Sequence, residues 1–138
     1  MKVAIVYYSA TGNTEAMADA IENALNGKAD VERFSPDAFS ADMVDNFDAI
    51  AFGCPAMGAE VLEEESFEPM FTAVESALGG KKIILFGSYG WGDGEWMRNW
   101  EERCKGDGAN LTHSPVIAQE APDESAIAEL EEAAASLL

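Results

Sequence analysis

The feature that most constrains this chain is a regular alternation of short apolar runs with stretches of helical periodicity. Each apolar run is rich in β-branched or aromatic residues and is bounded by turn residues, a pattern typical of strands. The predicted strands are Val3 to Tyr8, Ala29 to Phe34, Ala49 to Phe52, Ile83 to Phe86 and Leu111 to Ala118. Because these runs are apolar almost throughout, they predict a parallel sheet that is covered on both faces.

The segments between the predicted strands carry apolar residues at the spacing of one helix face. These residues are Met17, Ile21 and Leu25, then Phe67, Met70, Phe71, Val74 and Leu78, and finally Ile127, Leu130, Ala134 and Leu137. Residues 35–46 are rich in Asp, Ser and Pro and are predicted to form a short helix. The result is five βα units, which fit a single domain over residues 1–138.

This order of elements predicts an α/β fold of three layers, the doubly wound arrangement. In such sheets ligands bind at the carboxyl ends of the strands, near the point where the strand order reverses. The loops after the first, third and fourth strands are therefore the expected functional region. They comprise Ser9 to Thr14, Cys54 to Glu60 and Gly87 to Gly94.

The charge of the chain limits its partners. It has 26 acidic and 8 basic side chains, a net charge of −18, so nucleic acid and anionic membranes are repelled and basic partners are expected. Residues 1–8 are too short for the apolar core of a signal peptide, and no stretch approaches the roughly 18 apolar residues of a membrane span. Cys54 and Cys104 match neither a zinc site nor a disulfide framework. A soluble cytoplasmic protein is expected.

The loop after the first strand has the composition of an anion site. It consists of Ser9, Ala10, Thr11, Gly12, Asn13 and Thr14, and it leads directly into the first predicted helix. The free N–H groups at the start of that helix converge on one point, where hydroxyl and amide side chains also gather. Both the GxxxxGKS/T and the GxGxxG patterns are absent, which argues against a nucleoside triphosphate and a dinucleotide. The alternative is that the polar side chains only cap the helix.

The two other loops each place a large apolar side chain beside glycine. Met57 is followed by Gly58, and Trp91 lies between Gly90 and Gly92, so neither side chain is held by bulky neighbours. Side by side, these loops would form a slot with Met57 on one wall and Trp91 on the other, which suits an aromatic ring. The alternative is that both side chains fold back onto the core.

Three long motifs at these loops, YYSATGNTE, GCPAMGAE and LFGSYGWGDGEWM, resemble those of the flavodoxins, particularly the short-chain flavodoxins of anaerobic fermentative bacteria. The resemblance covers essentially the whole chain. It implies a five-stranded sheet of order 2-1-3-4-5 and one non-covalently bound flavin mononucleotide (FMN). It also implies an electron carrier rather than an enzyme, which passes single electrons at low potential between larger redox enzymes and uses neither a catalytic residue nor a metal.

The resemblance also assigns roles to individual positions. Ser9 to Thr14 and Ser88 would surround the 5′-phosphate, with Met57 on the inner flavin face and Trp91 on the outer face. Glu60 would accept the N3 hydrogen of the ring. The full set of residues expected to bind FMN is Ser9, Ala10, Thr11, Gly12, Asn13, Thr14, Pro55, Ala56, Met57, Gly58, Ala59, Glu60, Ser88, Tyr89, Gly90, Trp91 and Gly92.

Backbone groups complete the expected site. The backbone of Tyr89 to Gly92 would donate to the pyrimidine end of the ring, and the peptide joining Gly58 to Ala59 would lie beside N5. Ala10, Pro55 and Ala59 depart from common variants of the family, in which Gly, Ser and Asp occur. These departures affect the expected phosphate affinity and redox potential rather than the fold.

The expected chemistry follows from the residues around the ring. Gly58 permits a peptide turn toward N5 that favours a neutral semiquinone, because glycine adopts positive φ without penalty. The second electron would give an anionic hydroquinone, which a chain of charge −18 disfavours. The carboxylates expected to contribute are Glu60, Glu63, Glu64, Glu65 and Glu68. The same field predicts fast, salt-sensitive and transient docking of basic redox partners by a monomer.

The main alternative is an NAD(P)H-dependent flavin reductase on the same fold, which Trp91 disfavours because a covered ring leaves little room for a nicotinamide. Trp96, Trp100 and Cys104 follow a four-residue spacing and are expected in the core, as is Cys54. His113 has no apparent catalytic partners. Gln119 and Glu120 end the fifth predicted strand near the site, without an assigned contact.

Overall fold

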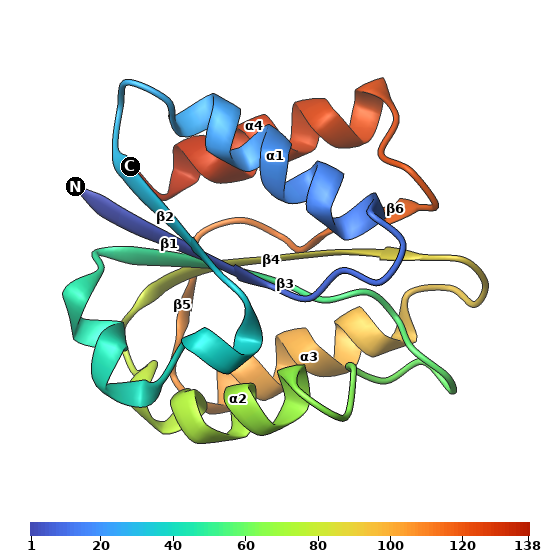
Figure 1. Cartoon of the computed structure of the whole chain (residues 1–138), viewed down its shortest axis with the longest axis horizontal. Helices are drawn as coiled ribbons and strands as arrows, with labels where there is room; N and C mark the ends of the chain where they lie inside the picture. The colour runs from blue at the N-terminus through green and yellow to red at the C-terminus, as the bar shows by residue number, and fades with distance from the viewer.

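The sheet of the computed structural model, which describes residues 1–138, is parallel throughout. Its strands are β1 (Lys2–Tyr7), β2 (Asp30–Phe34), β3 (Ala49–Gly53), β4 (Lys82–Tyr89), β5 (Asn110–Leu111) and β6 (Val116–Gln119). The order is β2-β1-β3-β4-β5, and β6 also pairs with β4. This arrangement confirms the predicted sheet order and the doubly wound fold (Figure 1).

The prediction of one continuous fifth strand, Leu111 to Ala118, was wrong. The structure divides it into β5, which pairs with Lys82 and Ile83, and β6, which pairs with the distal half of β4. Pro115 lies directly before β6 and has no N–H group to donate to a neighbouring strand. The two short strands therefore share the fifth position of the sheet, joined by residues 112–115.

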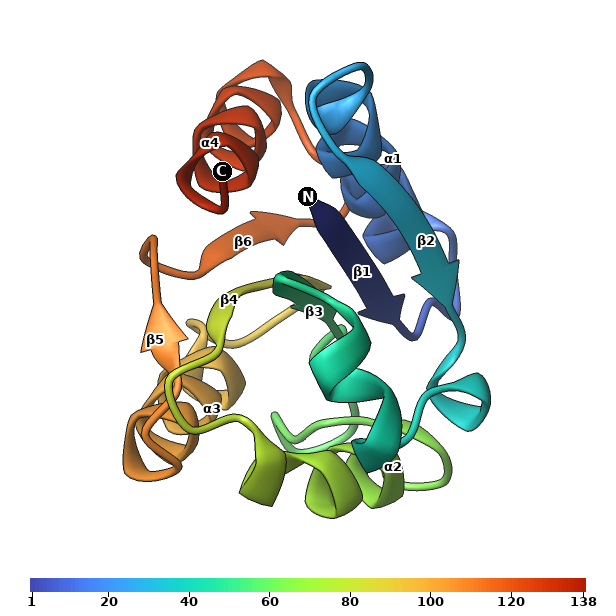
Figure 2. The same ribbon diagram turned by 90° about the vertical axis from the view of Figure 1, so that its left-hand side faces the viewer.

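Two pairs of helices cover the sheet (Figures 1 and 2). On one face lie α1 (Asn13–Leu25) and α4 (Glu124–Ser136), and on the other lie α2 (Phe67–Val74) and α3 (Glu95–Gly106). The helical spacing read from the sequence is confirmed for α1, where Met17, Ile21 and Leu25 are all fully buried. In α4 it was wrong at Ile127, which is 38% exposed at the first turn of the helix, whereas Leu130 and Ala134 are buried as predicted. None of the helices has both the length and the apolar composition required to cross a membrane.

The connection from β2 to β3 differs from the predicted helix. Residues 36–38 and 41–46 form two short 3₁₀ helices rather than an α-helix, so the count of five βα units was too high by one helix. Phe39, Val44 and Phe47 in and beside these turns are buried against the sheet. Aromatic packing thus holds this crossover, although its Pro, Ser and Asp residues disfavour a longer helix.

Each face of the sheet has its own core. The core under α2 and α3 is aromatic, with Phe52 against Phe71 and Phe67 against Trp100, each pair edge to face with ring centroids 5.3 Å apart. The core under α1 and α4 consists of aliphatic side chains and Met17. Phe86 is its only fully buried aromatic residue. Trp96, Trp100, Cys54 and Cys104 are buried, which confirms their predicted structural role.

Candidate functional site

The loops that follow β1, β3 and β4 lie at one end of the sheet (Figure 1). This is the edge where a doubly wound fold places its ligands. The fourth strand is longer than predicted, so Gly87 to Tyr89 belong to β4 and the loop itself begins at Gly90. The other predicted loop residues lie where they were expected, after β1 and β3.

The loop after β1 leaves several backbone N–H groups free at the start of α1. Gly12 is the N-cap, with φ of 93° in the left-handed region that glycine adopts most readily. The Ser9 Oγ accepts from the N–H groups of Gly12 and Glu15, each at 3.2 Å. The N–H groups of Thr11, Asn13 and Thr14 make no hydrogen bond within the protein. Unpartnered donors at a helix start form an anion site.

Helix capping explains only part of this loop. Ser9 does cap α1, as the alternative interpretation requires. Thr14 has another role: its hydroxyl is buried and lies 3.0 Å from the Ser88 hydroxyl at the end of β4. The Ser88 carbonyl in turn accepts from the Ala56 N–H at 3.0 Å. Ser88 therefore joins all three loops.

The loop after β3 is a closed turn. The N–H groups of Met57 and Val61 each donate to the other residue's carbonyl, at 2.9 Å and 3.0 Å. Within the turn, Gly58 has φ of 51° and Glu60 has φ of 55°. Positive φ is uncommon for a residue with a side chain, so Glu60 is held in a strained conformation. Met57 at the base of the turn is half-buried.

Glu60 connects this turn to the loop after β4. One oxygen of its carboxylate accepts from the Gly94 N–H at 3.3 Å. The carboxylate lies so close to Gly92 that a Cβ at that position would clash with it, and Gly92 itself has φ of 87°. A substitution at Gly92 would therefore displace Glu60.

The loop after β4 presents an exposed tryptophan. Trp91 is 66% exposed, which is inconsistent with the alternative that it folds back onto the core. The N–H groups of Gly90, Trp91 and Gly92 make no hydrogen bond within the protein. A large exposed aromatic side chain beside free donors favours the binding of a flat ring with polar edges.

The carboxylates after the Met57 turn differ in their surroundings. Burial alone would raise the pKa of Glu63, but hydrogen bonds from the Ser66 hydroxyl and from three backbone N–H groups lower it. Glu63 is therefore the cap of α2. Glu64 and Glu65 are exposed and remain free to act through their charge.

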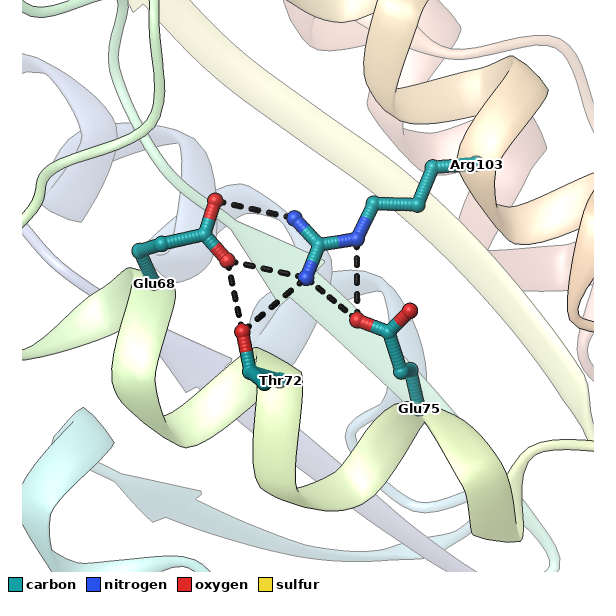
Figure 3. Close-up of polar contacts among 4 residues, drawn as sticks. All are labelled: Glu68, Thr72, Glu75 and Arg103. Carbon is teal, nitrogen blue, oxygen red and sulfur yellow. Dashed lines mark hydrogen bonds and ion pairs between the residues drawn. The ribbon is translucent and has the colours of Figure 1, made fainter.

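Arg103 links α2 and α3, the helices that follow the loops after β3 and β4 (Figure 3). From α3 its guanidinium donates to Glu68 on α2 at 2.9 Å, and it also pairs with Glu75. Thr72 donates to the other oxygen of Glu68 at 2.9 Å. Sequence reasoning missed this cluster, because the spacing of charges does not show which helices will be neighbours.

Two further features were missed. Arg33, on β2, lines an open cavity of about 330 Å³ with Ser9 and Glu15. Its guanidinium is engaged by Asp19, Glu22 and the Tyr7 hydroxyl.

The other missed feature is a contact between the end of β6 and the Trp91 loop. Gln119, the last residue of β6, donates to the Gly90 carbonyl, and the next residue, Glu120, donates to the Tyr89 carbonyl at the end of β4. The only available signal was their place at the end of the last strand.

Comparison with known proteins gives a single answer. The flavodoxin family model matches residues 5–133. The chain is 48% identical to a flavodoxin of Clostridium beijerinckii over 123 residues, 88% of each chain. It is 47% identical to that of Megasphaera elsdenii over 134 residues, which cover 96% of this chain and 98% of the relative.

A solved structure agrees with these sequence matches. The solution structure of the two-electron reduced Megasphaera elsdenii flavodoxin superposes with a TM-score of 0.88, at 50% identity and over 96% of this chain and 98% of the other. The reductase alternative finds no support among these relatives. The chain therefore belongs to the flavodoxin family, and it is an FMN-binding electron-transfer protein rather than an enzyme.

Proposed function

We propose that FMN is held by the three loops at the carboxyl edge of the sheet, through the residues predicted from the sequence. The observation that carries this proposal is the meeting of unpartnered N–H donors and an exposed Trp91 at one edge. When bound, the cofactor supplies one-electron redox chemistry. The protein binds it, orients it and limits the access of water.

The loop after β1 has no basic side chain of its own, and the guanidinium of nearby Arg33 is bound by Asp19, Glu22 and Tyr7. Three free N–H groups and the positive end of α1 offset the repulsion from a chain of charge −18. A hydrogen bond to a charged group contributes about 1.5–3 kcal/mol. Several such donors are sufficient to bind a dianion despite the acidic surface.

The other two loops hold the ring. Met57 and Trp91 would cover its faces, and the Glu60 carboxylate would accept a hydrogen at its pyrimidine end. The N–H groups of Gly90, Trp91 and Gly92, which are free in the structure, would donate at the same end. These contacts also exclude water, which strengthens each of the polar interactions.

The acidic surface lowers the redox potential and attracts basic partners. A unit charge about 10 Å away through water opposes added negative charge by about 0.4 kcal/mol, so the exposed Glu64 and Glu65 act together with more distant carboxylates. The same field accelerates encounters with basic redox proteins and makes them sensitive to salt. Docking is transient.

The proposed state of the protein is a single-domain monomer in the cytoplasm. Both cysteines are free and buried, and burial raises the pKa of the Cys104 thiol to about 12. Neutral, buried thiols are unreactive and match a reducing compartment. The two cores share one sheet, which supports one folding unit over residues 1–138.

Titration of the apoprotein with FMN tests the site. Trp91→Ala removes the exposed wall and is expected to weaken FMN binding roughly 30-fold, a loss of about 2 kcal/mol. Trp91→Phe keeps an aromatic face and retains most of the affinity. Dissociation constants from quenching of FMN fluorescence give the result. Equal affinity in Trp91→Ala and the native protein would refute the proposed ring site.

A further inference from the structure

The end of β6 binds two consecutive carbonyl groups, that of Tyr89 at the end of β4 and that of Gly90 at the start of the Trp91 loop. The backbone N–H of Glu120 donates to the Tyr89 carbonyl at 2.8 Å. The side-chain amide of Gln119 donates to the Gly90 carbonyl at 3.3 Å. Both carbonyl groups are therefore directed toward β6, on the outer side of β4.

The direction of these carbonyls determines the direction of two N–H groups. No peptide bond in the chain is cis, and in a trans peptide the N–H points opposite to the C=O. The N–H of Gly90 shares a peptide with the Tyr89 carbonyl, and the N–H of Trp91 shares one with the Gly90 carbonyl. Both N–H groups consequently point away from β6.

The opposite side is the side of the proposed ring site. In the sheet β4 lies between β3 and β6, so a group that points away from β6 points toward the loop after β3, which carries Met57. Neither the Gly90 N–H nor the Trp91 N–H has a partner within the protein. Unpartnered donors that are held in a fixed direction are pre-organised for a ligand acceptor.

We infer that Gln119 and Glu120 are positioning residues, which aim the Gly90 and Trp91 N–H groups at the cofactor. This inference rests on the proposed function of the Trp91 loop. Neither residue needs to touch the cofactor, since both act through the two carbonyls.

The backbone of Glu120 supports this role. It has φ of 59°, one of only two non-glycine residues in the left-handed region, and the other is Glu60 in the Met57 turn. Strained backbone of this kind is retained where the surrounding structure fixes it, often at functional sites. One oxygen of its side chain lies 3.4 Å from the position of a Cβ on Gly90, so the residue is packed along the loop.

Gln119 is the residue to change, because its contact is made by an exposed side chain. Gln119→Leu removes the donor. Gln119→Glu keeps the shape but places a carboxylate oxygen against the Gly90 carbonyl. The expected result is FMN binding about fivefold weaker in Gln119→Leu, the usual effect of one lost hydrogen bond, and weaker still in Gln119→Glu.

A second readout separates positioning from simple stabilisation. In ¹H–¹⁵N spectra, the amide shifts of Gly90 and Trp91 on FMN binding are expected to shrink in both variants, while the thermal midpoint of the apoprotein is unchanged. Ser40→Ala is the matched control, because it removes an exposed hydrogen bond from the Ser40 hydroxyl to Asp42, far along the chain from the Trp91 loop. Its affinity for FMN is expected to equal that of the native protein.

The possible outcomes are distinct. If Gln119→Leu binds FMN as the native protein does, while Trp91→Ala binds it weakly, the positioning role is overturned and the ring site stands. If neither substitution changes the affinity, the proposed function of the loop falls together with this inference.

Discussion

The loop after β1, proposed to bind phosphate and called here the phosphate loop, and the loops after β3 and β4, proposed to bind the ring and called here the ring loops, are built in different ways. In the phosphate loop, Ser9 contacts residues three and six positions away, and the helix that follows supplies the donors. In the ring loops, Glu60 reaches Gly94 across 34 residues and Gln119 reaches Gly90 across 29. One half of the site is therefore local, while the other depends on tertiary packing.

This difference has a functional consequence. A local phosphate site retains its geometry as long as α1 is folded, whereas the ring site changes when any of its distant supports moves. Affinity is expected to come mainly from the first half, and the redox potential to be set mainly by the second. The hydrogen bond between the buried hydroxyl groups of Thr14 and Ser88, 3.0 Å apart, connects the two halves of the site.

The largest expected effect concerns the phosphate. Riboflavin lacks this group, so it forgoes at least two charge-assisted hydrogen bonds, a loss of about 4 kcal/mol. It is expected to bind the apoprotein roughly 1,000-fold more weakly than FMN. Isothermal titration with both ligands provides the ratio. Similar affinities would mean that the loop after β1 does not bind phosphate.

The next effect concerns the support of the ring loops. Arg103→Met leaves Glu68 and Glu75 without their partner and is expected to lower the free energy of unfolding by about 2 kcal/mol, between the values for exposed and buried pairs, because the cluster is half-buried. Riboflavin affinity should fall, while the ratio of FMN to riboflavin affinity should stay constant.

The control for Arg103 is Arg98→Met, which breaks an exposed ion pair with Asp93. Exposed pairs contribute little, so the free energy of unfolding should be nearly unchanged. Urea denaturation of both variants makes the comparison. If both variants lose the same free energy of unfolding, the ion pairs between α2 and α3 stabilise the protein no more than an exposed pair does.

A smaller effect is expected at Gly58. A Cβ there would meet no atom within 4 Å, so the cost of Gly58→Ala is that of the left-handed backbone alone, about 1 kcal/mol. We expect a lower yield of the one-electron-reduced species in a spectroscopic redox titration, with FMN content nearly unchanged.

Gly106→Ala is the matched control for Gly58. Its Cβ would also lie in open space, but the residue ends α3 without positive φ. Alanine should therefore be neutral or slightly stabilising there. If the yield at Gly58→Ala equals that of Gly106→Ala, the conformation of the Met57 turn does not influence the redox state.

The smallest effect is the pH dependence from Glu63. Its pKa is lowered in the folded protein, so its contribution to stability is present above the unfolded pKa of about 4.3 and is lost as the pH falls through the lower folded value. Glu63→Gln keeps the shape of the cap without the charge. The variant should lose less stability than the native protein between neutral and acid pH, as measured by urea denaturation.

Exposed Glu64 provides the comparison for this acid effect. Glu64→Gln removes one negative charge from the same segment while leaving the hydrogen bonds accepted by Glu63 in place, so it controls for the change in net charge. If the free energy of unfolding of Glu63→Gln changes with pH as that of the native protein does, the charge of Glu63 does not contribute to capping α2.

The local half of the molecule was the predictable half. The run of Ser9 to Thr14 predicted free donors at the start of a helix, which the structure shows, and the glycines beside Trp91 predicted an exposed side chain, which it also shows. The binding of phosphate and of a ring by these loops stays a prediction. The doubly wound fold followed from the alternation of strands and helices, and the strand order from the family resemblance. These features depend on neighbouring residues or on patterns that repeat along the chain.

The remaining features required the folded chain. Pro115 divides the fifth strand, and aromatic burial holds residues 36–46 in 3₁₀ turns where a helix was expected. The contacts of Arg103 with Glu68, and of Gln119 with Gly90, join elements whose proximity is decided by the packing of the sheet. Spacing along the chain carries no signal for them.

The most direct test of the account is a ¹H–¹⁵N amide spectrum of the apoprotein during addition of FMN. The account predicts large shifts of the free N–H groups of Thr11, Asn13 and Thr14 and of those at Gly90 to Gly92, saturating at one FMN per chain. Shifts that spare these two groups, or that concentrate on another face of the sheet, would contradict it.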